Sequence, residues 1–150
     1  MQLDKLIIGT ANFSSKYGYR KKKVSSVQLK EIFKILKKYK IKSFDTAQSY
    51  GFSEALLARY IKTKKIYTKF NIPDIKKSSI ESETINLINK SFKNLKKKRI
   101  EGIMIHNSDF FIKKKVSQIK IIKLLNKYKK EKKIKKIGFS IYTPDEFIKI

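Results

Sequence analysis

The sequence predicts an α/β fold, a partial (β/α)8 TIM barrel made of its first five strand–helix units. Three observations support this prediction. Short apolar runs suited to buried strands alternate with longer segments whose apolar residues recur every three or four positions. The spacing of these runs suits right-handed crossovers between parallel strands. No glycine-rich phosphate turn follows the first run, which favours a barrel over an open, doubly wound nucleotide-binding sheet.

The element boundaries follow from turn and capping residues. The strands are expected at residues 5–10, 41–47, 65–70, 100–106 and 134–142. The helices are expected at residues 27–39, from 53 to about 61, from 78 to about 97, around 116–125 and from 143 onward. Capping boxes are expected at Ser25 with Gln28, Ser78 with Glu81 and Thr143 with Glu146. Residues 11–24 are expected to form a polar loop.

The helical stripes identify the faces that should pack against the sheet. The first helix should bury Leu29, Ile32, Phe33 and Leu36, and the fourth should bury Val116, Ile119, Ile122 and Leu125. A complete barrel of this type takes about 250 residues. We therefore expect residues 1–150 to form a single incomplete domain, truncated at its C-terminal side.

The composition excludes several function classes. The sequence has no cysteine and one histidine, so thiolate chemistry and histidine metal clusters are excluded. Neither a signal-peptide pattern nor a membrane-spanning run is present, and we expect a cytoplasmic protein. The formal net charge of +26 comes mostly from lysine, since only Arg20, Arg59 and Arg99 are arginines. Such a bias is typical of AT-rich genomes, so most of the charge should be solvated surface, and nucleic-acid binding is not expected.

Ionisable and polar residues follow the strands where each strand ends. Asp45 ends the second strand and Tyr50 lies in the loop after it. Lys69, His106 and Ser140 stand at the ends of the next three strands. The carboxyl ends of parallel strands share one rim, where the chemistry of such folds takes place. We therefore expect Asp45, Tyr50, Lys69 and His106 to converge.

Together these four groups could form a general acid. A free tyrosine has a pKa of about 10 and donates its proton poorly at neutral pH. The ammonium of Lys69 would stabilise the phenolate, and Asp45 would balance the buried ammonium. A neutral His106 could share the proton or direct a carbonyl oxygen toward Tyr50. The nucleophile must then come from elsewhere, and a hydride from a cofactor meets this need.

At these residues the sequence resembles the aldo/keto reductases. The segments that carry the resemblance are "LIIGTANF" with "KYGY", "FDTAQSYGFSE", "YTKF", "IMIHN" and "IKKIGFSIYTPDE". The resemblance implies reduction of a small aldehyde or ketone by NADPH or NADH, with Tyr50 as the proton donor. It also implies cofactor contacts from Thr10, Asp45 and Ser140.

The resemblance has departures as well. Ile141 stands where the family commonly has asparagine, and Ser14 and Ser15 lie where it often has glycine. Most groups that hold the nucleotide come from later strands in this family, so we expect the chain to be nearly inactive as it stands. The first and fifth strands would each leave an edge open to self-association.

A second hypothesis belongs to another function class. The chain could be a non-catalytic basic α/β module that binds polyanions or nucleic acid through lysine clusters. These clusters are Lys37–Lys40, Lys96–Arg99 and Lys127–Lys136, at the C-terminal ends of predicted helices. They would lie on the side of the sheet opposite the catalytic rim.

Overall fold

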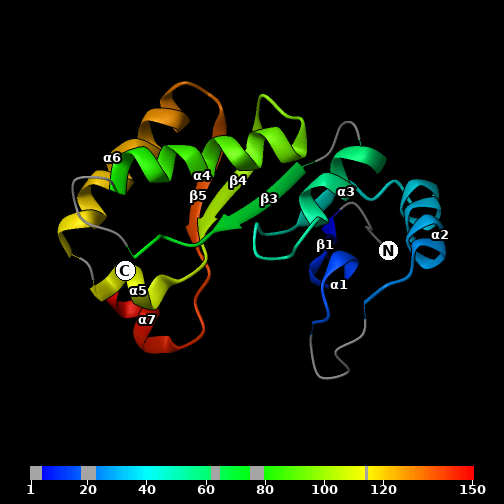
Figure 1. The fold of residues 1–150 in the computed structure, drawn as a ribbon, viewed down its shortest axis with the longest axis horizontal. Coiled ribbons are helices and arrows are strands. Elements are labelled where there is room, and N and C mark those ends of the chain that lie inside the picture. Colours follow the sequence, from blue (N-terminus) through cyan, green and yellow to red (C-terminus); the bar gives the residue numbers. More distant parts are fainter. Residues whose placement is uncertain (1–4, 18–22, 62–64, 75–79, 114) are drawn as a thin grey trace.

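Five parallel strands form one sheet in the order β1-β2-β3-β4-β5 (Figure 1). The computed structural model describes residues 5–17, 23–61, 65–74, 80–113 and 115–150. The strands are β1 (Ile7–Gly9), β2 (Ser43–Asp45), β3 (Lys65–Phe70), β4 (Ile100–Ile105) and β5 (Ile134–Phe139). Each strand pairs in parallel with the next one along the chain, which confirms the predicted α/β architecture.

Seven helices connect or follow these strands within the described residues. They are α1 (Ala11–Ser14), α2 (Ser26–Lys38), α3 (Ser53–Tyr60), α4 (Ile80–Leu95), α5 (Ser108–Lys113), α6 (Lys115–Lys130) and α7 (Pro144–Lys149). In the described part of the chain, no helix is both long enough and apolar enough to cross a membrane.

The strand register separates an apolar face from a polar face. Phe44 pairs with Ile8 on one side and with Ile66 on the other, and all three belong to the core or pack against it. Because side chains alternate along a strand, Asp45 and Lys69 lie on the opposite face. Period-two alternation thus places two of the predicted site residues on the same side of the sheet.

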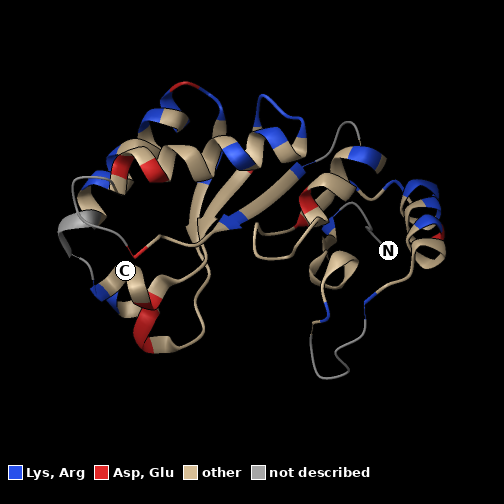
Figure 2. Ribbon diagram, viewed as in Figure 1, with Lys and Arg blue, Asp and Glu red and all other residues tan. Residues whose placement is uncertain are grey.

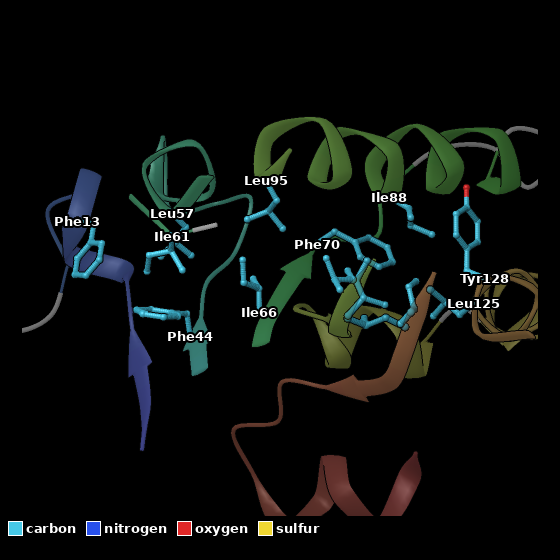
Figure 3. Packing of buried hydrophobic residues seen from close by; sticks show 14 of the residues in the cluster. Phe13, Phe44, Leu57, Ile61, Ile66, Phe70, Ile88, Leu95, Leu125 and Tyr128 are labelled. Atoms are coloured by element: carbon cyan, nitrogen blue, oxygen red, sulfur yellow. The ribbon is translucent and has the colours of Figure 1, made fainter. Parts of the chain in front are cut away.

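The hydrophobic core lies between the sheet and the helices on its apolar face. Figure 3 shows Phe44, Ile66 and Phe70 of the sheet beside buried side chains from three helices. Those helix residues include Leu57, Ile88, Leu95, Leu125 and Tyr128, all of them below 9% exposed. This core fixes the positions of the strands and so the positions of their carboxyl ends.

Sequence signals placed α2 correctly. Gln28 N–H donates to Ser25 Oγ at 3.2 Å, and Ser25 N–H donates to Gln28 Oε1 at 2.9 Å, so the predicted capping box is present. Leu29, Phe33 and Leu36 are buried as expected. At α7, Thr143 Oγ1 accepts from Glu146 N–H, but the Glu146 carboxylate accepts from Tyr142 N–H, so only half of that box forms. Ser78 lies outside the described residues.

Several expectations were wrong. The short helix α1 occupies part of the segment predicted as a loop and follows β1 directly, and a second short helix, α5, lies where no element was predicted. The strands β1, β2 and β5 are shorter than predicted, since their ends continue as loop. In α6, Leu125 is buried as predicted, but Ile119 is 62% exposed, and Ile121 and Leu124 are buried instead. The side chain of Val116 lies outside the described residues.

Three turns that follow helices share one geometry. Lys40, Lys96 and Lys132 have φ angles of 53°, 50° and 56°, in the left-handed region. Lys40 and Lys132 are the second residues after α2 and α6, and Lys96 is the first residue after α4. The N–H of each donates to a carbonyl three residues earlier. The following N–H donates to a carbonyl five residues back, as in a Schellman motif. These turns return the chain to β2, β4 and β5.

Candidate active site

A bidentate ion pair lies at the carboxyl ends of β2 and β3. Lys69 Nζ donates to Asp45 Oδ1 at 2.7 Å and to Oδ2 at 2.6 Å, and also to the carbonyl of Thr46 at 3.3 Å. The Lys69 side chain is 9% exposed and that of Asp45 is 32% exposed. Burying an ammonium is costly unless an anion balances it, and Asp45 provides that balance.

The turn that carries Tyr50 is fixed by a serine of α1. Ser14 Oγ donates to the Tyr50 carbonyl at 2.6 Å and accepts from Phe52 N–H at 2.5 Å. Gly51 lies between them with a φ of 59°, and a Cβ there would come 2.5 Å from Ser14 Oγ. The turn therefore requires glycine for two reasons, its left-handed backbone and its contact with Ser14.

The side chains of Tyr50, Lys69 and His106 meet at this edge of the sheet. Lys69 Nζ lies over the ring of Tyr50, 5.4 Å from its centroid. The His106 ring meets the Tyr50 ring edge-on, with centroids 5.8 Å apart and planes at 85°. Tyr17 approaches from another side, at 5.9 Å between ring centroids. The structure thus brings together the side chains of Tyr17, Tyr50, Lys69 and His106, which are far apart in the sequence.

The pKa of Tyr50 shifts in the direction opposite to the one predicted from the sequence, although the phenol is protonated at neutral pH in either case. Burial is the main cause, and the negative charge of Asp45 is the next, of a rise in the pKa of Tyr50 to about 12. Because Lys69 is bound to both oxygens of Asp45, its charge is largely neutralised before it can act on the phenol. Tyr50 is therefore protonated at neutral pH, and Lys69 does not lower its pKa as expected.

His106 is held by contacts at both its backbone and its ring. Its N–H donates to the Phe70 carbonyl at 2.9 Å, and its Nδ1 lies 3.2 Å from Ser49 Oγ. Burial, and next the positive charge of Lys69, lower the pKa of His106 below its usual value of 6.5. The imidazole is therefore neutral at pH 7, as the sequence analysis expects.

The sequence model of the aldo/keto reductase family matches residues 5–150. The chain belongs to the aldo/keto reductase family. No curated protein matches the sequence. The lysine clusters that suggested a non-catalytic basic module gain no support from these comparisons.

Solved aldo/keto reductases share the fold. A Pseudomonas aeruginosa protein assigned to this family is 22% identical, with a TM-score of 0.69 over 89% of this chain and 54% of its own. A Klebsiella pneumoniae aldo-keto reductase in complex with NADPH is 16% identical, with a TM-score of 0.67 over 95% and 48%. A Bacillus halodurans aldo-keto reductase in its holo form is 18% identical, with a TM-score of 0.68 over 96% and 48%. This chain spans about half the length of these proteins.

Thr10 and Ser140, which were predicted to contact a cofactor, differ in access. Thr10 is fully buried, and its hydroxyl donates to the Asp45 carbonyl at 3.0 Å, so it supports Asp45. Ser140 follows β5 and is half-buried, with its N–H bound to the Ile105 carbonyl at 2.8 Å. Its hydroxyl forms no hydrogen bond with the described residues. Cofactor contact by either residue stays a prediction.

Two groups at this polar edge of the sheet remain accessible for hydrogen bonding. Asp45 exposes part of its carboxylate beside Lys69, and the Ser140 hydroxyl, which bonds to none of the described residues, follows a backbone bond to Ile105, the residue before His106. Among the described residues, no cluster of three His, Cys, Asp or Glu side chains could hold a metal ion.

Sequence reasoning missed one buried carboxylate that supports this edge. Glu54 of α3 is 1% exposed, and its Oε1 accepts from Thr68 Oγ1 at 2.7 Å and Ser91 Oγ at 2.8 Å. Its Oε2 accepts from Asn94 Nδ2 at 2.9 Å. The sequence indicates Glu54 only as a residue near the start of a helix. Its position one turn after Gly51, close to the buried Leu57, was the feature that could have indicated a buried carboxylate.

Proposed function

We propose that this chain carries the catalytic groups of an NAD(P)H-dependent carbonyl reductase. The convergence of Tyr50 with the Asp45–Lys69 ion pair and the neutral His106 supports the proposal. The substrate would be a small aldehyde or ketone. The bound cofactor, NADPH or NADH, supplies the hydride that the carbonyl carbon accepts.

Tyr50 would donate the proton to the carbonyl oxygen. With its pKa raised to about 12, Tyr50 holds its proton at neutral pH. An alkoxide is about as basic as hydroxide, so its conjugate acid has a pKa well above that of Tyr50. Transfer from Tyr50 to the developing alkoxide is therefore favourable even with the raised pKa.

The neighbouring groups would orient and tune this transfer. His106 is neutral, so one ring nitrogen can donate to the carbonyl oxygen while Ser49 holds Nδ1. Lys69 and Asp45 would keep the site electrically balanced, and Ser14 would keep Tyr50 in place. Because the chain spans about half the length of the structures it resembles, we expect its turnover to be slow.

Deuterium transfer is a sensitive test of this proposal. The chain would be incubated at high concentration with benzaldehyde and NADPH or NADH deuterated at the transferable position. We expect slow formation of deuterated benzyl alcohol, detected by mass spectrometry. Tyr50→Phe should reduce that formation by about 100-fold or more, since it removes the proton donor.

A second tyrosine serves as the matched control. Tyr39 follows α2 and is 50% exposed, so Tyr39→Phe should leave deuterium transfer unchanged. The proposal fails if the wild-type chain transfers no deuterium, or if Tyr50→Phe transfers it at the wild-type rate.

A further inference from the structure

A basic hollow lies at the amino ends of β3, β4 and β5. Its volume is about 490 Å³, and its charged lining consists of Lys65, Arg99, Glu101, Lys129, Lys132 and Lys135. Figure 2 shows Lys and Arg gathered in the turns from α4 to β4 and from α6 to β5, which contribute to this lining. Lys65 and Lys69 stand at opposite ends of β3, roughly 13 Å apart along the strand. The hollow is thus separate from the candidate active site.

The charges in the hollow are unbalanced. Glu101 Oε1 pairs with Lys135 Nζ at 3.0 Å, and this pair neutralises one of the five cations. Within the described chain, Lys65, Arg99, Lys129 and Lys132 form no ion pair with a carboxylate. Four unpaired cationic residues therefore line one concave space, and an anion that enters it lowers their mutual repulsion.

The arrangement depends on backbone geometry as well as on composition. A lysine-rich chain presents lysine over its whole surface, but here cations from three separate segments meet in one hollow. Lys132 takes its place through a turn with a φ of 56°, and Arg99 directly precedes β4. The floor is formed by Ile100 and Ile134, which are 6% and 1% exposed.

We propose that this hollow binds the phosphate chain of a small di- or triphosphate ligand. A linear triphosphate carries about four negative charges at neutral pH, which matches the four unpaired cations. The guanidinium of Arg99 can bind two phosphate oxygens at once. A volume of about 490 Å³ is within the usual range for small-molecule sites and exceeds what one phosphate group needs.

Two ligand sources share this chemistry. One is an inorganic polyphosphate, and the other is a nucleotide. The phosphate chain is the part that the cations recognise in either case, since Ile100 and Ile134 are nearly buried and offer little surface to a base. Titration with both tripolyphosphate and metal-free ATP distinguishes the sources, because tighter binding of ATP would show that the base or ribose makes contacts of its own.

Calorimetric titration of the 150-residue chain with tripolyphosphate at about 50 mM salt tests the proposal. We expect saturable binding that weakens as salt is added. The triple variant Lys65→Gln, Arg99→Gln, Lys132→Gln should bind about tenfold more weakly or worse, since it removes three of the unpaired cations. Circular dichroism would show that each variant keeps its fold.

A variant with the same change in net charge separates a site from general attraction. Lys123, Lys127 and Lys130 line a neighbouring hollow on α6 and serve as the control when all three become Gln. The control should keep its affinity within about twofold. Equal weakening of both variants, or no binding by the wild-type chain, would overturn the proposal. So would a single-stranded RNA that binds far more tightly and is weakened equally by both variants.

If the triple variant fails to fold, nuclear magnetic resonance of the wild-type chain decides. Tripolyphosphate should shift the amide signals of Lys65, Arg99 and Lys132 and leave those of Lys123 and Lys127 unchanged. Shifts confined to the second group would place the anion elsewhere and contradict the proposal. NADPH titration would show whether the cofactor uses the same residues, independently of any turnover.

Discussion

The carboxylate of Asp45 holds the ammonium of Lys69 with both oxygens, while Tyr50 lies over that ammonium with its ring. The phenol therefore experiences a nearly neutral pair and a partly buried environment. Burial is the main cause of the rise in its pKa to about 12, and the negative charge of Asp45 is the next. Asp45 acts in two ways, because its charge raises the pKa of Tyr50 and also neutralises Lys69.

Asp45→Asn should lower the pKa of Tyr50. The change removes a negative charge that disfavours the phenolate, and it frees the charge of Lys69 to stabilise it. At pH 11 the wild-type phenol should be mostly protonated, and the variant phenol should be more ionised. Ultraviolet absorbance of tyrosinate, with Tyr50→Phe used to isolate the Tyr50 signal, measures the difference.

Asp109→Asn provides the control for that titration. Asp109 is exposed and pairs with Lys113 at 3.8 Å on α5. Its replacement by Asn removes the same charge as Asp45→Asn, but on a different element from Tyr50. Its Tyr50 titration should match the wild type. A pKa of Tyr50 that stays the same or rises in Asp45→Asn would show that burial alone sets it.

The residues of the site were predictable, but their electrostatics were not. Asp45, Lys69 and His106 follow from their places at strand ends, because parallel strands bring those ends to one rim. The direction of the Tyr50 pKa depends on how Lys69 divides its contacts between Asp45 and the phenol, which only three-dimensional geometry determines. Ser14 was also unpredictable, since its partners lie 36 and 38 positions away.

At the scale of elements, lysine occupies three turn positions that favour glycine. Lys40, Lys96 and Lys132 all have left-handed backbone angles near 50°. A side chain costs about 1–2 kcal/mol in that conformation, and glycine avoids this cost. Glycine in turn loses about 0.5–1 kcal/mol more entropy on folding.

Each of Lys40→Gly, Lys96→Gly and Lys132→Gly should therefore stabilise the chain by about 0.5 kcal/mol or slightly more. The free energy of unfolding in urea measures the effect, and the three changes should add because the turns are separate. Lys34→Gly, in the exposed middle of α2, should instead cost about 1 kcal/mol. Destabilisation by all three turn variants would contradict the assignment of these turns.

Long elements were predicted better than short ones. The 3.6-residue pattern with the Ser25 cap located α2 to within about one residue at each end. The four residues of α1 are too few to show a period, so they read as loop. In α6 apolar residues occur on more than one face, so Leu125 was placed correctly, while Ile119 was predicted to be buried and Ile121 is buried in its place.

At the scale of the whole molecule, the sheet has two edges within the described residues. The strand order leaves β1 and β5 with one neighbour each, and Ile7 on β1 is 53% exposed. Unpaired strands can pair with another copy of the chain. The net charge of +26 opposes such contact through repulsion that salt screens.

We therefore expect the chain to self-associate with rising concentration, and more strongly at about 0.5 M salt than at 0.05 M. Ile7→Lys should reduce this association, because it adds a charge at the exposed edge. Val27→Lys adds the same charge on α2, where Val27 is 66% exposed, and should reduce association less. Sedimentation velocity measures both. Association that is equal in both variants would place the contact elsewhere.

The contact between Gly51 and Ser14 links two positions that are 37 residues apart. A methyl group at position 51 and a hydroxymethyl group at position 14 compete for the same space. A smaller residue at position 14 would make room for a side chain at position 51, but it would not relieve the left-handed backbone there. Homologues that vary at position 14 are therefore expected to keep glycine at position 51.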